Sequence, residues 1–252
     1  MDTPDDSFSV ITSLSYSAAY PSEPFSLLPR HFARLKTAHS TLARELPDCW
    51  CARTEVPSDA GLRDELDTEV RSAKDGGHEG DLRIRLSILP TGLPLAEAFP
   101  LTPMPSYAIR LVLDDRPTSY DDPFLRNKTS KRGKYDRARE RHGATLHPSD
   151  LPDAPPFDVI LINSYGEITE TTISNIAFRF KPSGPYITPH SSCGLLEGVQ
   201  RADLLEKGEI VEGVVTVQEV RKAVADGICE IVCFNGVRGV FEAYVAEEAK
   251  AS

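Results

Sequence analysis

A stretch rich in lysine and arginine lies near the middle of the chain, from Phe124 to Asp136. Such a run commonly forms a solvated helix face. A lysine can nevertheless act as a nucleophile near neutral pH, where burial or neighbouring positive charge disfavours its ammonium form. Lys128, Lys131 and Lys134 are the candidate amines, and their residue types alone do not choose between them.

A glutamate inside a predicted strand is the second candidate group. Residues 168–180 are expected to form one long strand after a hairpin turn, and Glu170 stands among its threonines. A glutamate at mid-strand is unusual, because strands favour β-branched and aromatic residues. Glu170 is therefore either a functional carboxylate or part of an exposed strand face, whereas Glu167 belongs to the turn and is expected on the surface.

Two tight backbone segments are suited to binding a phosphate. A helix is expected over 199–207, and the unpaired amides at a helix start bind anions without any specific side chain. The turn that closes the predicted strand 228–234 offers a second set of amides. The candidate anion-binding residues are Gly198, Val199, Gln200, Asn235, Gly236 and Val237.

Candidate substrate contacts are spread over several predicted strands. Arg83 and Arg85 share one face of their strand, because alternate side chains point to opposite sides. The alternative for both is a solvated surface position. Arg110 is a further candidate for binding a carboxylate. The residues that we predict to contact substrate are Thr12, Arg85 and Arg238.

These groups need a scaffold, and the hydrophobic pattern predicts an α+β chain. In the amino-terminal half, strands are expected over 7–17, 25–28, 82–89 and 107–113. Helices are expected over 30–46, ended by Pro47, and over 58–74, capped by Ser58 or Asp59. The proline-rich stretch 90–105 is interpreted as a loop or a crossing segment.

The carboxy-terminal half is predicted to be richer in strands. The basic stretch leads into a helix that ends near Gly143. Besides the strand that contains Glu170, strands are expected over 157–163, 210–217, 228–234 and 240–245, with a short helix over 219–225. We therefore predict a small α/β domain, residues 1–116, followed by a strand-rich domain resembling a distorted barrel, residues 117–252.

Length and charge limit the class of protein. The chain has 252 residues, a formal net charge of −10 and 40% hydrophobic residues, which is ordinary for a globular protein and argues against a general affinity for nucleic acid or anionic membrane. No apolar run is long enough to span a membrane, and the acidic start does not look like a secretory signal, so a cytosolic protein is expected. The five cysteines fit no zinc spacing and are expected to be structural thiols, with no metal bound.

Four segments, taken in order, resemble those of the fold-type IV pyridoxal-phosphate enzymes, the class IV aminotransferase superfamily, and within it the aminodeoxychorismate lyases. These segments are His31–Leu35, Phe124–Asp136, Gly166–Ile176 and Gly194–Arg201. The string Lys-Thr-Ser-x-Arg-x-x-Tyr after Phe-Leu-Arg then makes Lys128 the Schiff-base lysine, which also moves the substrate proton. The resemblance further implies that Glu170 keeps the pyridine nitrogen of pyridoxal 5'-phosphate protonated, that Arg34 binds its phosphate and that His31 is structural.

The resemblance also implies a homodimer, a small amino substrate and a cofactor site at the interface of the two domains. Three functions stay open. The first is a lyase that eliminates pyruvate from 4-amino-4-deoxychorismate to give 4-aminobenzoate. The second is an aminotransferase for a branched-chain or D-amino acid or an amine. The third is a non-catalytic relative that binds a ligand. Two departures from the family pattern keep this third function open: Asn127 stands where relatives often have histidine, and Glu197 stands where they often have proline.

Overall fold

The structure is a computed structural model, and it describes residues 6–119 and 122–246. By its internal contacts the chain divides into two compact units. Unit 1 comprises Met1–Pro103 and Asn127–Lys131, and unit 2 comprises Met104–Arg126 and Arg132–Ser252. The short segment Asn127–Lys131 therefore belongs to unit 1, although both of its neighbours in the sequence belong to unit 2.

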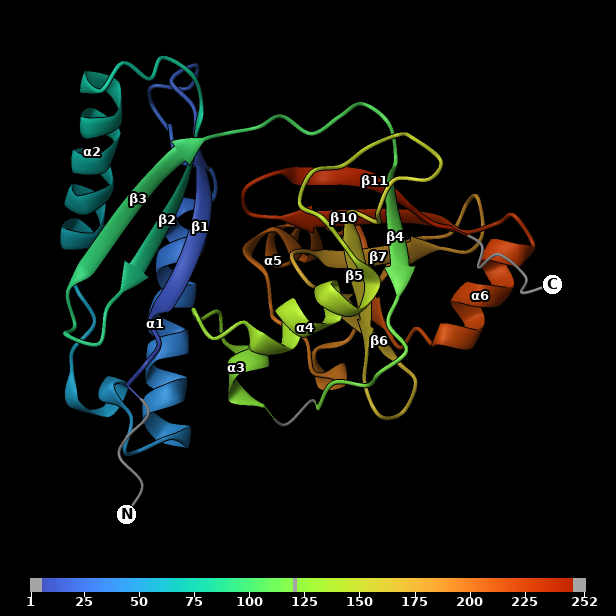
Figure 1. Cartoon of the computed structure of the whole chain (residues 1–252). Helices are drawn as coiled ribbons and strands as arrows, with labels where there is room; N and C mark the ends of the chain where they lie inside the picture. Colours follow the sequence, from blue (N-terminus) through green and yellow to red (C-terminus); the bar gives the residue numbers. More distant parts are fainter. Residues whose placement is uncertain (1–5, 120–121, 247–252) are drawn as a thin grey trace. The chain divides into compact units, whose positions relative to one another are not determined.

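Unit 1 is a three-stranded antiparallel sheet, in the order β1-β2-β3, with helices packed against it (Figure 1). Its elements are β1 (Val10–Tyr16), α1 (Leu28–Glu45), the 3-10 helix η1 (Trp50–Arg53), α2 (Asp59–Asp75), β2 (Leu82–Ile88) and β3 (Pro94–Pro100). Helix α1 contacts β1, and α2 contacts β3. The predicted helical stripe is confirmed, because Leu35 and Leu42 of α1 are fully buried. Ser58 caps α2 by accepting a hydrogen bond from Gly61 N at 3.2 Å.

Two predictions for unit 1 are wrong. The proline-rich stretch 90–105 contains strand β3, which lies at the edge of the sheet. Pro94 and Pro100 stand at its two ends, where a missing N–H is tolerated. The short returning strand over 25–28 is reduced to a single bridge between Phe25 and Tyr16. Helix α1 begins at Leu28 instead, because a proline at its start already has the φ angle of a helix.

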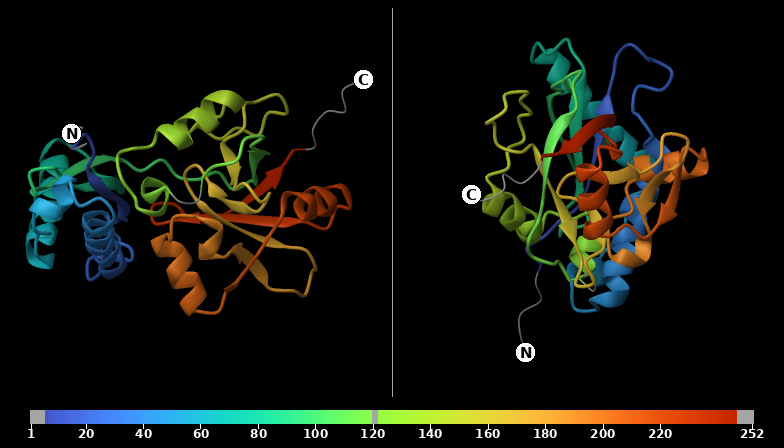
Figure 2. Two further views of the ribbon diagram at one scale, coloured as in Figure 1. Left: turned by 90° about the horizontal axis from the view of Figure 1, so that it is seen from below. Right: turned by 90° about the vertical axis from the view of Figure 1, so that its right-hand side faces the viewer.

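Unit 2 is built on an eight-stranded sheet in the order β6-β5-β4-β11-β10-β7-β8-β9. Figure 2 shows from two further directions that the strands of this sheet curl rather than lie flat. Its elements are β4 (Ile109–Leu113), α3 (Pro123–Arg126), α4 (Gly133–His142), β5 (Asp158–Ile162), β6 (Ile168–Thr171), β7 (Asn175–Arg179), β8 (Tyr186–Pro189), η2 (Ser191–Cys193), α5 (Val199–Glu206), β9 (Ile210–Gly213), α6 (Val217–Ala225), β10 (Glu230–Asn235) and β11 (Gly239–Val245). Ile109, Phe157, Ile176, Phe178 and Ile231 form the centre of its core.

The predicted single strand over 168–180 is wrong. It is interrupted after Thr171, so that β6 pairs with β5 whereas β7 pairs with β10 and β8. The buried side chain of Asp158 causes the break, because its carboxylate accepts from the backbone N–H of Thr172 at 3.1 Å and from that of Ile173 at 3.2 Å. A backbone N–H that donates to a side chain cannot also donate to a neighbouring strand.

The predicted strand 210–217 is also too long, since β9 ends at Gly213. Thr216 instead begins α6 through a capping box. Its Oγ1 accepts from Glu219 N at 3.2 Å, and Glu219 Oε2 accepts from Thr216 N at 2.8 Å.

The α+β class is confirmed. The division by contacts differs from the boundary predicted after Arg116, because β4 pairs with β11 and β5 and so belongs to unit 2. All five cysteines are unpaired thiols, four of them buried. Within the described ranges, no helix has both the length and the apolar character needed to cross a membrane.

Candidate cofactor site

Lys128 stands on a strand-like backbone at the edge of β1 in unit 1. The N–H of Ile11 donates to Lys128 O at 2.9 Å, and an antiparallel bridge joins Thr129 to Val10. Asn127 and Thr129 are buried, and Lys128 between them is half-buried. This arrangement fixes the backbone of the candidate lysine and leaves its side chain partly accessible.

The other two lysines have different surroundings. In unit 2, Lys134 Nζ forms an ion pair with Asp122 Oδ2 at 2.5 Å. In unit 1, Lys131 Nζ lies 5.8 Å from the ring centre of Phe8. Lys128 instead lies close enough to His31 for its charge to help lower the pKa of that imidazole. The guanidinium of Arg34 acts on the same imidazole, so His31 has two cationic neighbours.

A buried hydrogen-bonded group joins β1 to the first turns of α1. Arg34 Nη2 donates to Thr12 Oγ1 at 2.5 Å, and Thr12 Oγ1 lies 2.7 Å from His31 Nδ1. Burial first, then the charges of Arg34 and Lys128, hold the pKa of His31 well below its ordinary value. His31 is therefore neutral near pH 7, and Arg34 is the guanidinium of this group.

Glu170 is buried in unit 2, so the alternative of an exposed strand face is wrong. Only 4% of this residue is exposed. Its Oε1 accepts from the Tyr135 hydroxyl at 2.8 Å and from the backbone N–H of Leu196 at 3.1 Å. Its Oε2 lies 3.5 Å from Nδ2 of Asn175. Donors of this kind stabilise a buried carboxylate. Glu167, in the turn before β6, is half-buried.

The start of α5 is fitted closely to Asn175. The amide Nδ2 of Asn175 donates to Leu196 O at 2.8 Å. A Cβ on Gly198 would lie 2.1 Å from Asn175 Oδ1, so only glycine fits at this position. Gly198 is the N-cap of α5, and the N–H groups of Val199 and Gln200 fall in the first turn, where the helix supplies no acceptor.

The second tight turn is organised by the side chain of Asn235. Its Oδ1 accepts from Val237 N at 3.0 Å and from Arg238 N at 2.9 Å, across Gly236. Its Nδ2 donates to Ser174 Oγ at 2.9 Å. The turn is thereby joined to the break between β6 and β7, and the amide of Val237 is already engaged.

The predicted substrate contacts do not form one group. Thr12 is fully buried and bonded to Arg34. Arg85 is exposed and lies on the opposite face of the same sheet, since β1 pairs with β2 in a register that places it across from Ser13. The guanidinium of Arg238, in unit 2, lies 5.4 Å from the ring centre of Phe157. Their contact with substrate stays a prediction.

Asn127 and Glu197 are the two positions at which this chain departs from the family pattern. Asn127 is 7% exposed and stands within the strand-like segment beside β1. The side chain of Glu197 is exposed. The carboxylate therefore does not occupy the space at the start of α5.

Sequence reasoning assigned no role to Tyr135 or Asn175, although both contact Glu170. The signal for Tyr135 is its spacing, three residues after Arg132 and four before Arg139, which places all three on one face of a helix. Asn175 had no such signal. On a single strand it would point away from Glu170, because side chains five positions apart lie on opposite faces, and only the break after β6 brings them together.

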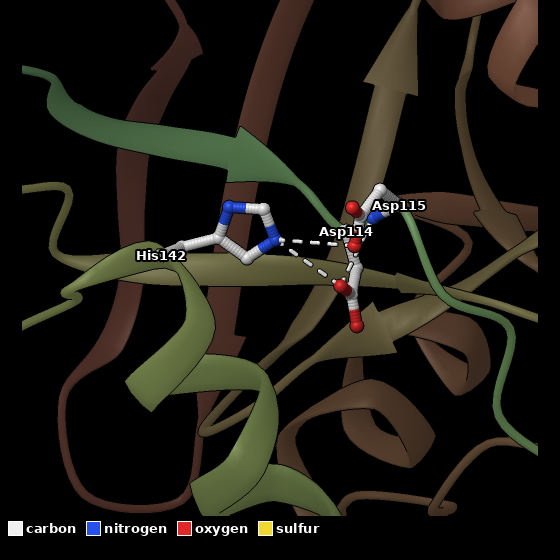
Figure 3. Close-up of side chains that lie close together, drawn as sticks. All are labelled: Asp114, Asp115 and His142. Atoms are coloured by element: carbon white, nitrogen blue, oxygen red, sulfur yellow. Dashed lines mark hydrogen bonds and ion pairs between the residues drawn. The ribbon is translucent and has the colours of Figure 1, made fainter.

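Asp114, Asp115 and His142 also lie close together in unit 2 (Figure 3). His142 Nε2 lies 3.1 Å from Asp114 Oδ1, and its ring points toward both carboxylates. Arg141 Nη2 donates to Asp114 Oδ2 at 2.5 Å. Because a guanidinium already compensates the buried carboxylate, this group is an ion-pair cluster that links α4 to the end of β4.

Comparison with known proteins identifies the family to which these groups belong. Residues 10–243 match the model of the amino-transferase class IV family. The chain belongs to this family. Class IV aminotransferases use pyridoxal phosphate, so the prediction of an enzyme with this chemistry is confirmed, as is the fold-type IV architecture.

The proteins to which the chain is similar carry two kinds of name. A Schizosaccharomyces pombe protein provisionally named aminodeoxychorismate lyase is 30% identical over 202 residues, which cover 80% of this chain and 76% of that protein. A Mesorhizobium loti structure provisionally named amino-acid aminotransferase is 26% identical with a TM-score of 0.76, covering 95% of this chain and 100% of that one. The structure of the 4-amino-4-deoxychorismate lyase of Pseudomonas aeruginosa shares the fold. It is 20% identical, with a TM-score of 0.64, and the match covers 95% of this chain and 83% of that one.

In this member of the class IV family, the buried Arg34 group fits the anionic part of the cofactor. Within the described residues, the side-chain atoms Arg34 Nε and His31 Nε2 are buried and have no hydrogen-bond partner. Burial lowers the pKa of Arg34 to about 10. A buried guanidinium with an unused N–H is stabilised by an anion, and its planar fork matches a phosphate.

Replacing Arg34 with alanine is expected chiefly to weaken cofactor affinity. A charge-assisted hydrogen bond contributes about 1.5–3 kcal/mol, so the dissociation constant for pyridoxal phosphate should rise roughly tenfold to a hundredfold. The measurement is a fluorescence or absorbance titration of the cofactor-depleted protein. Arg44→Ala, on an exposed part of the same helix, is the matched control. An affinity unchanged by Arg34→Ala would return Arg34 to a purely structural role.

Proposed function

We propose that this chain binds pyridoxal phosphate and uses it as a lyase that converts 4-amino-4-deoxychorismate to pyruvate and 4-aminobenzoate. The choice of reaction rests on one observation, the 30% identity to the S. pombe protein with the lyase name over 80% of this chain. The buried Arg34 group and the buried Glu170 support the choice of cofactor.

Each candidate residue has one task in this proposal. Lys128 Nζ is the amine to which the cofactor attaches, and it then takes the proton from the substrate carbon as pyruvate leaves and the ring becomes aromatic. Arg34 and the amides of Val199 and Gln200 bind the phosphate. Glu170 accepts a hydrogen bond from the protonated ring nitrogen. The bound cofactor supplies an electron sink for the charge left on the substrate.

A second function, amino-group transfer, is favoured by a different observation. The M. loti structure with the aminotransferase name matches along its whole length with a TM-score of 0.76. The same residues would perform the same tasks, but the amino group would pass to a keto acid and no carbon fragment would be eliminated. Substrate binding therefore decides between the two reactions, and Thr12, Arg85 and Arg238 stay the predicted contacts.

The deciding experiment supplies both kinds of substrate to the protein loaded with pyridoxal phosphate. With 4-amino-4-deoxychorismate alone, a lyase releases pyruvate and 4-aminobenzoate in equal amounts, and both are measured by chromatography. With D-alanine or a branched-chain amino acid plus 2-oxoglutarate, an aminotransferase forms glutamate. Glutamate formation without 4-aminobenzoate would reject the lyase. A homodimer and a cytosolic location accompany the proposal and are tested by light scattering and by cell fractionation.

A further inference from the structure

One face of α4 is bonded to the strand that carries Glu170. Helix α4 packs beside β5 in unit 2 (Figure 1). Tyr135 donates to Glu170 Oε1 at 2.8 Å. Arg132 Nη2 donates to Thr172 O at 2.5 Å, and Arg139 Nη1 donates to Thr172 Oγ1 at 3.0 Å. The helix and its N-cap residue are therefore hydrogen-bonded both to Glu170 and to Thr172, the residue that follows β6.

We propose that Tyr135 is a positioning residue that orients Glu170 and keeps it negatively charged, so that a proton shared with the cofactor resides on the ring nitrogen and not on the carboxyl group. The inference rests on the proposed function, because it concerns the residue assigned there to the ring nitrogen.

The two shorter bonds to Glu170 converge on one oxygen. Tyr135 and the backbone N–H of Leu196 both donate to Oε1, and Asn175 Nδ2 lies 3.5 Å from Oε2. Donors to a carboxylate stabilise its charged form. Oε1 is thus the anchored oxygen, and the direction of the carboxyl group is set by α4 on one side and by the loop before α5 on the other.

The surroundings of Tyr135 keep its hydroxyl protonated, so that it remains a hydrogen-bond donor. Burial, followed by the charge of Glu170, raises the pKa of its phenol well above the ordinary value, so the hydroxyl keeps its proton at neutral pH. The hydroxyl also lies 3.2 Å from Leu125 O, a longer distance than that to Glu170. Its ring is 5% exposed, packs with Leu125 and Ala138, and has the guanidinium of Arg132 4.5 Å from its centre. The phenol therefore has one well-defined position.

The variant Tyr135→Phe separates this role from packing, because it keeps the ring and removes only the hydroxyl. Tyr186→Phe is the matched control. Tyr186 also donates to a glutamate of unit 2, Glu230, at 3.2 Å, in an exposed ion-pair group that has no part in the proposed site. A purely structural hydroxyl would alter the melting temperature in either variant and nothing else.

The experiment loads wild type and both variants with pyridoxal phosphate labelled with ¹⁵N at the ring nitrogen. The ¹⁵N chemical shift reports whether that nitrogen is protonated. Tyr135→Phe should take up the cofactor, move the signal toward the unprotonated position and lower kcat roughly tenfold to a hundredfold with a smaller change in KM. Tyr186→Phe should match wild type. An unchanged shift and an unchanged kcat in Tyr135→Phe would overturn the inference.

A second variant covers the case in which Tyr135→Phe fails to fold. Incorporation of 4-aminophenylalanine at position 135 keeps the ring and replaces the O–H by a weaker N–H donor, so the ¹⁵N signal should move part of the way toward the unprotonated position. The inference is rejected if the signal stays where it is. Wild-type protein that takes up no cofactor would refute the proposed function itself, whereas uptake with an unresponsive nitrogen signal refutes only the role of Tyr135.

Discussion

Replacing Lys128 with alanine is expected to abolish covalent attachment of the cofactor. Lys128 stands on a fixed backbone beside β1 and lies near the neutral imidazole of His31. A lysine attaches to a carbonyl carbon through its neutral, nucleophilic amine. Borohydride reduction of the loaded wild-type protein, followed by peptide mapping, should place the label on Lys128, and the alanine variant should take up no label and show no turnover.

Lys131→Ala and Lys134→Ala are the matched controls for this prediction. Lys134 is paired with Asp122, and Lys131 lies near the ring of Phe8. Both variants should retain the yellow colour and the label at Lys128. A reduced adduct that persists in Lys128→Ala would transfer the attachment role to one of these two lysines.

Replacing Glu170 with glutamine should leave the cofactor bound and lower turnover by roughly a hundredfold to a thousandfold, the usual cost of removing one preorganised electrostatic group. Glutamine keeps the oxygen that accepts from Tyr135 and from the Leu196 N–H. It removes the negative charge that holds a proton on the ring nitrogen. The measurement combines a cofactor titration with kcat for whichever reaction the protein performs.

Glu167→Gln, in the turn before β6, is the control for the Glu170 variant because Glu167 is half-buried on the same hairpin. It should show wild-type kcat. Turnover near the wild-type level in Glu170→Gln would remove Glu170 from the ring-nitrogen role and leave it as a buried structural carboxylate.

The sequence predicted those parts of the fold that depend on local periodicity. The alternation around β1, the apolar stripe of α1 and the cap at Ser58 each depend on a few neighbouring residues, and all three are present. The resemblance likewise pointed to Glu170, and the structure buries that residue. Predictions from local periodicity hold in the folded structure because the residues that form the element also determine which of its faces is buried.

The features that the sequence did not reveal depend on distant partners. The break between β6 and β7 requires the carboxylate of Asp158, fourteen residues before Thr172, and the amide of Asn235, sixty-one residues after Ser174. The contact between Asn175 and Glu170 follows from that break. The contact between Tyr135 and Glu170 was hidden for the same reason, because the two residues are thirty-five positions apart.

The assignment of Asn127–Lys131 to unit 1 has a consequence for how the protein is made. Unit 1 otherwise ends at Pro103, and residues 104–126 separate it from this segment. During translation, Arg34, Thr12 and His31 leave the ribosome long before Lys128 does. The hydrogen-bonded group of Arg34, Thr12 and His31 can form first, and the segment that carries Lys128, the proposed nucleophile, joins unit 1 later. A polypeptide interrupted anywhere between 104 and 127 would keep Arg34 and lack Lys128, so unit 1 acquires its last strand-like segment only after most of the first half of the chain has been made.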